Sequence, residues 1–371
     1  MKLIQQFLFL SLFVSCANEM VRGGILRNDP IIVKKHIKDA DPNWIHSVYG
    51  KSLLIEAVLV GNTNIVQTLI DHNADVNLRV EYGSTALHSA TCNDKTDIAS
   101  ILLKANANPN IKSVQGNSPI HCSSKIGNLE ITKNLIKHQA NPNDRDQKGR
   151  TPIMFASEFG HTEIIKFLIA NGGDPNLRDH ISLNALFIAI MQNRVESVKT
   201  LIANSIDLEL VDEHGVTALM EAASRNDDTI LELLLNAGAN PNVRDKDGIS
   251  ALMYACKLGR EKTTKRLLQA NANPNEQDRY GSTALHYASS NGKLDTVKIL
   301  SESNVSLDQK DYFGNTALML SVRNQQMEVA EFLIQANANV LLRNFLGYSA
   351  LDYANKPSME KIKKLIEEKI K

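Results

Sequence analysis

The sequence has no excess charge of either sign, few cysteines and no long hydrophobic run. Its 371 residues carry 41 basic and 41 acidic side chains, so the formal net charge is zero. This balance excludes the electrostatic attraction by which proteins wrap nucleic acid or coat an anionic membrane. The expected partner is therefore another protein. At this length a single compact core is not expected, which leaves two or three domains or a repeat array.

The four cysteines are Cys16, Cys92, Cys122 and Cys256. No pair has CxxC spacing and no cysteine–histidine spacing suits zinc, so the sequence predicts no metal site and no cofactor. We interpret the last three cysteines as small buried apolar residues rather than as disulfides or ligands.

Residues 1–17, MKLIQQFLFLSLFVSCA, are typical of a signal peptide: one lysine, a mostly apolar run too short to span a bilayer, then small residues. The end of this segment resembles the lipobox of bacterial lipoproteins, with phenylalanine where leucine is usual, which makes Cys16 a lipidation candidate. It also suits an ordinary cut after Ala17. We expect an exported protein, either periplasmic, anchored to a membrane by an N-terminal lipid, or secreted. The alternative is a cytoplasmic protein in which residues 1–17 remain as an uncleaved helix.

The rest of the chain repeats with a period of 33 residues. Anchor glycines recur at steps of 33 or twice 33, and the one gap falls at Ser182; the glycines are Gly50, Gly83, Gly116, Gly149, Gly215, Gly248, Gly281, Gly314 and Gly347. Two residues after each anchor comes Ser, Thr or Asn, four after comes Leu or Ile, and seven after comes Ala or Ser. A large aliphatic residue three positions before a small one predicts a helix face that a neighbouring helix can approach closely.

A second helix is predicted in each unit, because position nineteen after the anchor is always Leu or Ile and shares its face with earlier apolar residues. Just beyond it, position twenty-three is Asn or Gly in seven of nine units, including Asn106 and Asn271 in the two copies of NANPN. These residues readily adopt the left-handed conformation that ends a helix. In NANPN the next Asn is expected to bond its own backbone and the proline to prevent further helix. An extended finger follows, often with Asp three residues before the next anchor.

Three stretches make the resemblance specific: GSTALHSA from Gly83, GRTPIMFA from Gly149 and NAGANPN from Asn236. They resemble the ankyrin repeat, and the match covers about residues 18–371. The resemblance implies an all-α solenoid of stacked helix pairs with projecting β-hairpin fingers. It also implies protein binding through the fingertips and the concave groove of the inner helices, without catalysis.

The resemblance divides the chain into four parts. They are the signal segment 1–17, an N-terminal capping half repeat at 18–49 with a poor first helix, nine repeats at 50–346 and a C-terminal capping repeat at 347–371. In the last part Ile362, Leu365, Ile366 and Ile370 are expected to face inward, because a repeat stack must end in a surface that water can wet.

No place for catalysis is apparent. Every interval between anchors is an undisturbed multiple of 33, and no P-loop, HExxH, Rossmann or GxSxG pattern occurs. Ser290 and Lys293 match SxxK in spacing but fall at the turn between paired helices. His88, His121 and His286 hold the position at which the family's histidine commonly bonds a finger backbone. We therefore predict no catalytic residue.

The positions that packing leaves free are the fingertips and the end of the first helix. Aromatic and arginine side chains there carry much of the binding energy at interfaces, although adjacent fingertips also stack aromatics on one another. The candidate binding residues are His180, Glu213, His214, Lys246, Arg279, Tyr280, Tyr312, Phe313, Phe345 and Tyr348. The sequence thus predicts a non-enzymatic scaffold exported by a bacterium. The alternatives are an intracellular adaptor and an exported enzyme that uses the groove.

Overall fold

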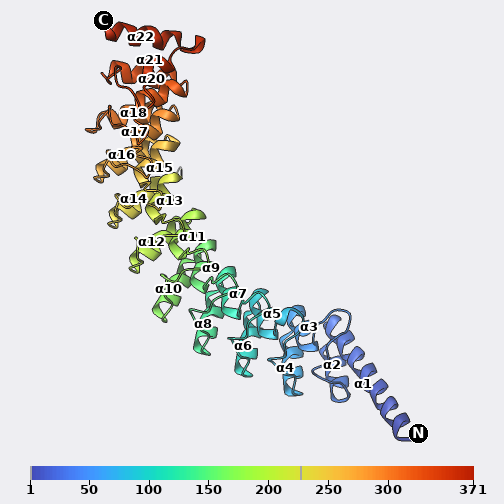
Figure 1. The fold of residues 1–371 in the computed structure, drawn as a ribbon. Helices are drawn as coiled ribbons and strands as arrows, with labels where there is room; N and C mark the ends of the chain where they lie inside the picture. Colours follow the sequence, from blue (N-terminus) through green and yellow to red (C-terminus); the bar gives the residue numbers. More distant parts are fainter. Residues whose placement is uncertain (1, 226–227) are drawn as a thin grey trace. The chain divides into compact units, whose positions relative to one another are not determined.

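The chain forms two compact units of paired helices. The computed structural model describes residues 2–225 and 228–371, with side chains from Leu12 onward apart from Glu81. The units are Met1–His180 and Ile181–Lys371, and in each the helices follow one another in pairs (Figure 1). The all-α class expected from the sequence is confirmed, since the described residues form helices and no sheet.

In the first unit, α1 and α2 precede four repeats whose first helices are α3, α5, α7 and α9. Neighbouring first helices contact one another, as do neighbouring second helices. The helices are α1 Lys2–Leu26, α2 Pro30–His36, α3 Leu53–Val60, α4 Thr63–Asp71, α5 Ala86–Cys92, α6 Thr96–Lys104, α7 Pro119–Ile126, α8 Leu129–Lys137, α9 Pro152–Phe159 and α10 Thr162–Ala170, with 3₁₀ turns at Ile37–Asp39 and Glu81–Gly83.

The second unit continues the same alternation, and its first helices are the odd-numbered ones. Its helices are α11 Ala185–Met191, α12 Val195–Ala203, α13 Ala218–Ser224, α14 Asp228–Asn236, α15 Ala251–Leu258, α16 Glu261–Gln269, α17 Ala284–Ser290, α18 Leu294–Ser301, α19 Ala317–Arg323, α20 Met327–Gln335, α21 Ala350–Tyr353 and α22 Glu360–Ile370, with a 3₁₀ turn at Pro357–Met359.

The polar residue two positions after each anchor begins the first helix as its N-cap. Thr217 shows the geometry: its hydroxyl accepts a hydrogen bond of 3.3 Å from the backbone N–H of Met220. Such a cap satisfies an amide that the helix itself leaves free. Asn184 performs the same role where the anchor glycine is missing, by accepting from Leu186 and Phe187.

The apolar positions predicted from the period form the core. The residue at position nineteen is fully buried in every repeat, from Leu69 to Ile366, and the small residue at position seven is buried throughout, from Ala57 to Ala354. Small residues let the first helices stack closely while the second-helix leucines fill the space behind them. The core of each unit is thus a continuous row of such layers.

The predicted helix ends are confirmed. All seven Asn and Gly residues at position twenty-three have positive φ, among them Asn106 at 63° and Asn271 at 62°. The two other residues at this position, Gln139 and Ser205, adopt the same conformation at 67° and 57°. Every residue at this position therefore adopts the left-handed conformation, whatever its side chain.

The last Asn of NANPN has a role that the sequence did not reveal. The Asn110 side chain accepts a 2.9 Å hydrogen bond from the backbone of Asn141 and donates one of 2.9 Å to the carbonyl of Gln139, both in the next repeat. Asn275 does the same with Ser306 and Asn304. We call this row the asparagine ladder, and we call a residue that makes both hydrogen bonds a full rung; the full rungs include Asn77, Asn110, Asn143, Asn242 and Asn275.

The fingers, which are the loops between one repeat and the next, are closed by their own side chains. The Asp278 carboxylate accepts hydrogen bonds from the backbone of Tyr280 and Ser282, both at 2.8 Å, which turns the chain at the tip. Isolated bridges such as Arg244 with Ser250 and Arg343 with Ser349 join the two sides. The expected β-hairpins are not confirmed, because no strand occurs in the described part of the chain.

Helix α1 is a single helix from Lys2 to Leu26 and includes Gly23 and Gly24, so the poor first helix expected for the N-terminal cap is wrong. Packing begins within it: Phe13 and Cys16 are exposed, whereas Ala17 and Asn18 are buried. No helix of residues 2–225 and 228–371 is both long and apolar enough to cross a membrane.

At the C-terminal end, α22 covers the last repeat. Ile362 and Ile366 are fully buried as expected, and Leu365 is half-buried. Ile370 leaves 46% of its surface exposed, so its expected inward orientation is wrong, because the helix ends there and has no further layer to pack on.

We expect Leu219→Ala to lower the free energy of unfolding by about 2–5 kcal/mol, because Leu219 is 1% exposed and its truncation leaves a cavity. Leu341→Ala, in the same unit at a residue 64% exposed, is the matched control and should change it by less than about 0.5 kcal/mol. Urea denaturation checks both, and an equal effect of the two changes would contradict the assignment of the core.

Candidate functional site

Four of the ten candidate binding residues line one hollow in the second unit. Tyr280, Tyr312, Phe313 and Phe345 come from three successive fingers and surround a volume of about 630 Å³. All four are exposed, from 53% for Tyr280 to 75% for Phe345. The floor comes from the end of α19, where Leu320, Arg323 and Asn324 lie.

The rings in this hollow do not stack on one another: within the described chain none of the four contacts another aromatic ring. Tyr312 and Phe345 instead pack against the anchor glycine of the preceding finger. A Cβ placed on Gly281 would lie 2.5 Å from the Tyr312 ring, and one on Gly314 would lie 3.1 Å from the Phe345 ring. Tyr312 and Phe345 therefore help to pack the fingers, whereas Tyr280 and Phe313, one residue closer to their own anchors, stand at the tips.

The hollow contains one cation without a counter-ion. Arg323 is exposed and, among the residues that the structure describes, has no carboxylate within 4 Å. Asp311 also lines the hollow, but it accepts hydrogen bonds from the backbone of Phe313 and Asn315 and from the Asn315 amide. Its charge is thus used within its own finger. Sequence reasoning had marked the end of the first helix as a free position without singling out Arg323.

The other candidate residues are exposed but lie outside this hollow. Arg279 forms an ion pair of 2.5 Å with Asp247 and lies 5.4 Å from the centre of the Tyr280 ring. Tyr348 packs against Tyr353, with ring centres 5.7 Å apart.

The remaining four sit on earlier fingers. Glu213 and His214 approach each other at 3.6 Å, and the backbone N–H of Lys246 donates to the carbonyl of His214. His180 belongs to the first unit, where its backbone N–H donates to Lys148. Glu213, His214 and Lys246 thus lie on two neighbouring fingers of the second unit, and none of them lines the hollow with the four rings.

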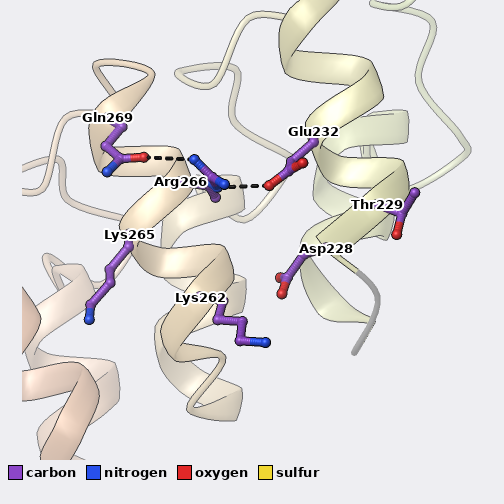
Figure 2. Close-up of a pocket in the computed structure, with 7 residues that line it drawn as sticks. All are labelled: Asp228, Thr229, Glu232, Lys262, Lys265, Arg266 and Gln269. Atoms are coloured by element: carbon purple, nitrogen blue, oxygen red, sulfur yellow. Dashed lines mark hydrogen bonds and ion pairs between the residues drawn. The ribbon is translucent and has the colours of Figure 1, made fainter.

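A second hollow of the second unit lies between the second helices α14 and α16 and measures about 610 Å³ (Figure 2). Arg266 bridges it by an ion pair of 2.8 Å to Glu232 and a hydrogen bond of 3.3 Å to Gln269. Its exposed charges of both signs are typical of a solvated helix surface, which makes it a weaker candidate than the aromatic hollow.

Comparison with known proteins agrees with this repeat architecture. A family model described as ankyrin repeats (3 copies) matches residues 24–113, 107–179, 172–245 and 220–311, and one described as ankyrin repeats (many copies) matches 299–354. The chain belongs to the ankyrin-repeat family. No curated protein matches its sequence. Ankyrin repeats are generally scaffolds for protein–protein interaction and are typically not enzymes.

The three histidines of the ankyrin motif have structural partners on both ring nitrogens. His88 accepts a hydrogen bond at Nδ1 from the backbone of Thr85, so its proton resides on Nε2, which donates to the carbonyl of Asn117 in the next finger at 2.9 Å. His121 and His286 repeat this pattern. Burial lowers the pKa of all three below the usual value of about 6.5. These side chains therefore join each repeat to the next one.

No cluster of three His, Cys, Asp or Glu that could hold a metal occurs in residues 2–225 and 228–371. The SxxK match has the geometry expected of a turn, because Ser290 ends α17 and Lys293 is the residue before α18.

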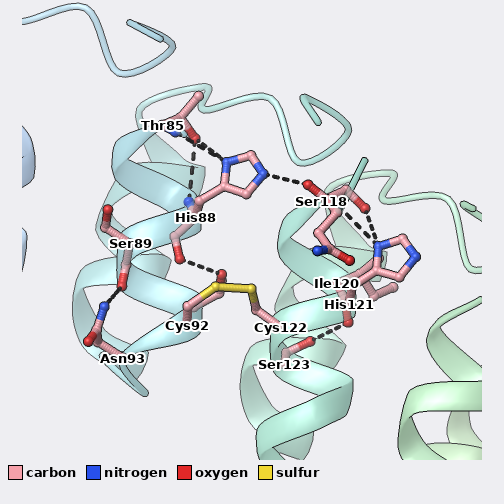
Figure 3. Close-up of a disulfide and its surroundings, with 12 residues drawn as sticks. Thr85, His88, Ser89, Cys92, Asn93, Ser118, Ile120, His121, Cys122 and Ser123 are labelled. Carbon is pink, nitrogen blue, oxygen red and sulfur yellow. Dashed lines mark hydrogen bonds between the residues drawn. A yellow bond between two sulfur atoms is a disulfide. The ribbon is translucent and has the colours of Figure 1, made fainter. Parts of the chain in front are cut away.

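The interpretation of the cysteines was wrong for two of them. Cys92 and Cys122 form a disulfide between α5 and α7 of the ankyrin stack, with their Cα atoms 4.9 Å apart (Figure 3). Cys92 is exposed and Cys122 is half-buried, so neither belongs to the core. Cys256 is buried as expected, and this burial raises the pKa of its thiol to about 12. A bridge across 30 residues stabilises the fold by about 3–4 kcal/mol, chiefly by restricting the unfolded chain.

The buried histidines predict a pH dependence of stability. Because the pKa of His286 is lower in the folded chain than in the unfolded chain, the unfolded state takes up a proton first as the pH falls below about 6.5. The free energy of unfolding should therefore decrease from pH 7.5 to pH 5.5. His286→Gln should reduce this decrease, whereas His214→Gln, at an exposed fingertip, should not. Urea titrations at the two pH values test this, and an unchanged pH dependence in His286→Gln would contradict it.

Proposed function

We propose that this protein is a non-enzymatic ankyrin-repeat scaffold that binds another protein through the aromatic hollow of its second unit. The observation that carries the proposal is the set of exposed rings without ring partners, Tyr280, Tyr312, Phe313 and Phe345, around the unpaired Arg323. Core packing does not require these four exposed rings, and Tyr280 and Phe313 stand at the tips of their fingers. Aromatic and arginine side chains are the residues that most often dominate interface energies.

The chemistry of the hollow favours a partner segment that combines an apolar side chain with a carboxylate. The rings offer apolar surface whose burial would stabilise the complex, and Arg323 offers a planar donor pair that matches a carboxylate. The fingers that carry the rings are held in place by their own aspartates, so little ordering is needed on binding. We further propose that the fingers act as projecting hairpins, which isolated bridges such as Arg343 with Ser349 support.

Phe313→Ala is expected to weaken partner binding about tenfold or more, because Phe313 is 62% exposed at a fingertip of the hollow. Its effect on the free energy of unfolding should remain below about 0.5 kcal/mol. Met327→Ala removes a side chain that is 47% exposed on the second helix α20 and serves as the matched control.

The measurement is quantitative cross-linking and affinity capture with the unchanged protein and both variants, followed by titration of a captured protein. A partner retained by Met327→Ala and lost by Phe313→Ala supports the hollow. Equal affinity for all three proteins would contradict it.

We also propose that the protein is exported. Two features support this. The exposed residues Phe13 and Cys16 precede Ala17 and Asn18, the first buried residues among those whose side chains the structure describes, so removing the segment up to this point leaves most of the packed part of α1 in place. The Cys92–Cys122 disulfide suits an oxidising compartment outside the cytoplasm.

Mass spectrometry of the native N-terminus is expected to find either a lipid-modified Cys16 or a chain that starts at Asn18. The first result indicates a membrane-anchored lipoprotein and the second a periplasmic or secreted protein. A native chain that begins with an intact Met1 would contradict export and favour the intracellular adaptor.

A further inference from the structure

The disulfide occupies positions that repeat packing leaves free. Cys92 stands nine residues after its anchor and Cys122 six after the next one. Lys257 and Tyr287 occupy the same two positions in a later pair of consecutive repeats. They make only a cation–π contact, in which Nζ of Lys257 lies 5.8 Å from the centre of the Tyr287 ring. Stacking between α5 and α7 rests instead on Leu87 and Ile120, both fully buried. We therefore expect the repeats to remain stacked when the bridge opens.

The two cysteine residues differ in their exposure to solvent. Cys92 is exposed at the end of α5, whereas Cys122 is half-buried on α7. Both line a hollow of about 280 Å³ beside the bridge. From the greater exposure of the Cys92 residue we infer that an incoming molecule reaches this side of the bridge first.

The helix ends favour a thiolate at one sulfur only. Cys92 is the last residue of α5, at the negative end of that helix dipole, whereas Cys122 lies in the first turn of α7, at the positive end of its dipole (Figure 3).

The neighbouring charges point the same way. Lys125, one turn beyond Cys122, lines the hollow and has no carboxylate within 4 Å in the described chain, whereas Arg150 is paired with Asp146 at 2.9 Å. Near Cys92 the closest acidic residue in sequence is Asp94, and the Lys95 amine is directed toward Gly61 in the preceding repeat.

We propose that the Cys92–Cys122 bridge is a thiol-exchange site at which a small-molecule thiol bonds to Cys92 and Cys122 departs. The thiolate of the small molecule attacks Sγ of Cys92 and forms a mixed disulfide, and the electron pair of the old S–S bond leaves on Sγ of Cys122. A second small thiol attacks the sulfur of the bound one, which releases Cys92 as a thiolate. Two small thiols are oxidised to one disulfide, and the bridge is reduced to two protein thiols.

The direction follows because exchange is faster when the attacked sulfur is accessible and the departing thiolate is stabilised. Access and helix-end electrostatics select the same direction independently. Exchange would give this interface between repeats a bridged state, an open state and a state that carries the small thiol on its first-helix surface.

The test treats the folded full chain with reduced glutathione, stops the reaction with acid at early times, blocks free thiols and maps tryptic peptides. Cys92 and Cys122 fall on separate peptides, 80–95 and 113–125, so the position of glutathione is read directly. We expect glutathione on Cys92 in at least about threefold excess over Cys122. The buried thiol of Cys256 should stay unmodified and shows that the chain is still folded.

Lys125→Glu should lower this excess, because it places a negative charge beside the departing thiolate. Lys104→Glu, an exposed lysine at the end of α6, is the matched control and should leave the ratio unchanged. Glutathione found equally on both cysteines or mainly on Cys122, or no adduct while the chain is folded, would overturn the proposal.

Discussion

Contact between neighbouring repeats is the interaction on which the rest of the structure depends. No repeat has an interior of its own: the buried leucine at position nineteen and the small residue at position seven complete their packing only against the next helix pair. The asparagine ladder adds a polar connection at the edge, since rungs such as Asn110 satisfy a donor and an acceptor of the following repeat. Stability is therefore distributed over the neighbouring repeats of each unit.

The 33-residue period was sufficient to predict the repeat architecture, because each residue that builds it meets a structural requirement that recurs in every repeat. The left-handed helix ends, the buried leucines and the helix-pair architecture followed directly. Asn110 was understood only in part, because its partners lie 29 and 31 residues away and a local pattern shows only its own turn. Cys92 and Cys122 were misread for a related reason: they occupy different positions in consecutive repeats, so the period does not align them.

The binding surface could be predicted only as a class of positions. Exposed fingertips and first-helix ends were identified as free, and the structure brings four of the ten candidates to one hollow. It also separates rings with two roles, since Tyr312 and Phe345 lean on glycines of preceding fingers while Tyr280 and Phe313 do not show this contact. The sequence could not make this distinction, because it depends on how one fingertip approaches the next in space.

The ladder also has weaker rungs. Glu209 and Asp308 stand where other repeats have asparagine, and each accepts a hydrogen bond of 2.8 Å from the next repeat, but a carboxylate has no N–H to give in return. In the second unit, Glu209 and Asp308 thus each connect their repeat to the next one by one such hydrogen bond, whereas Asn242 and Asn275 each do so by two. Under a stretching force along the chain, the edges of neighbouring repeats would separate first at these two connections. A repetitive structure would thus have defined sites at which mechanical unfolding begins.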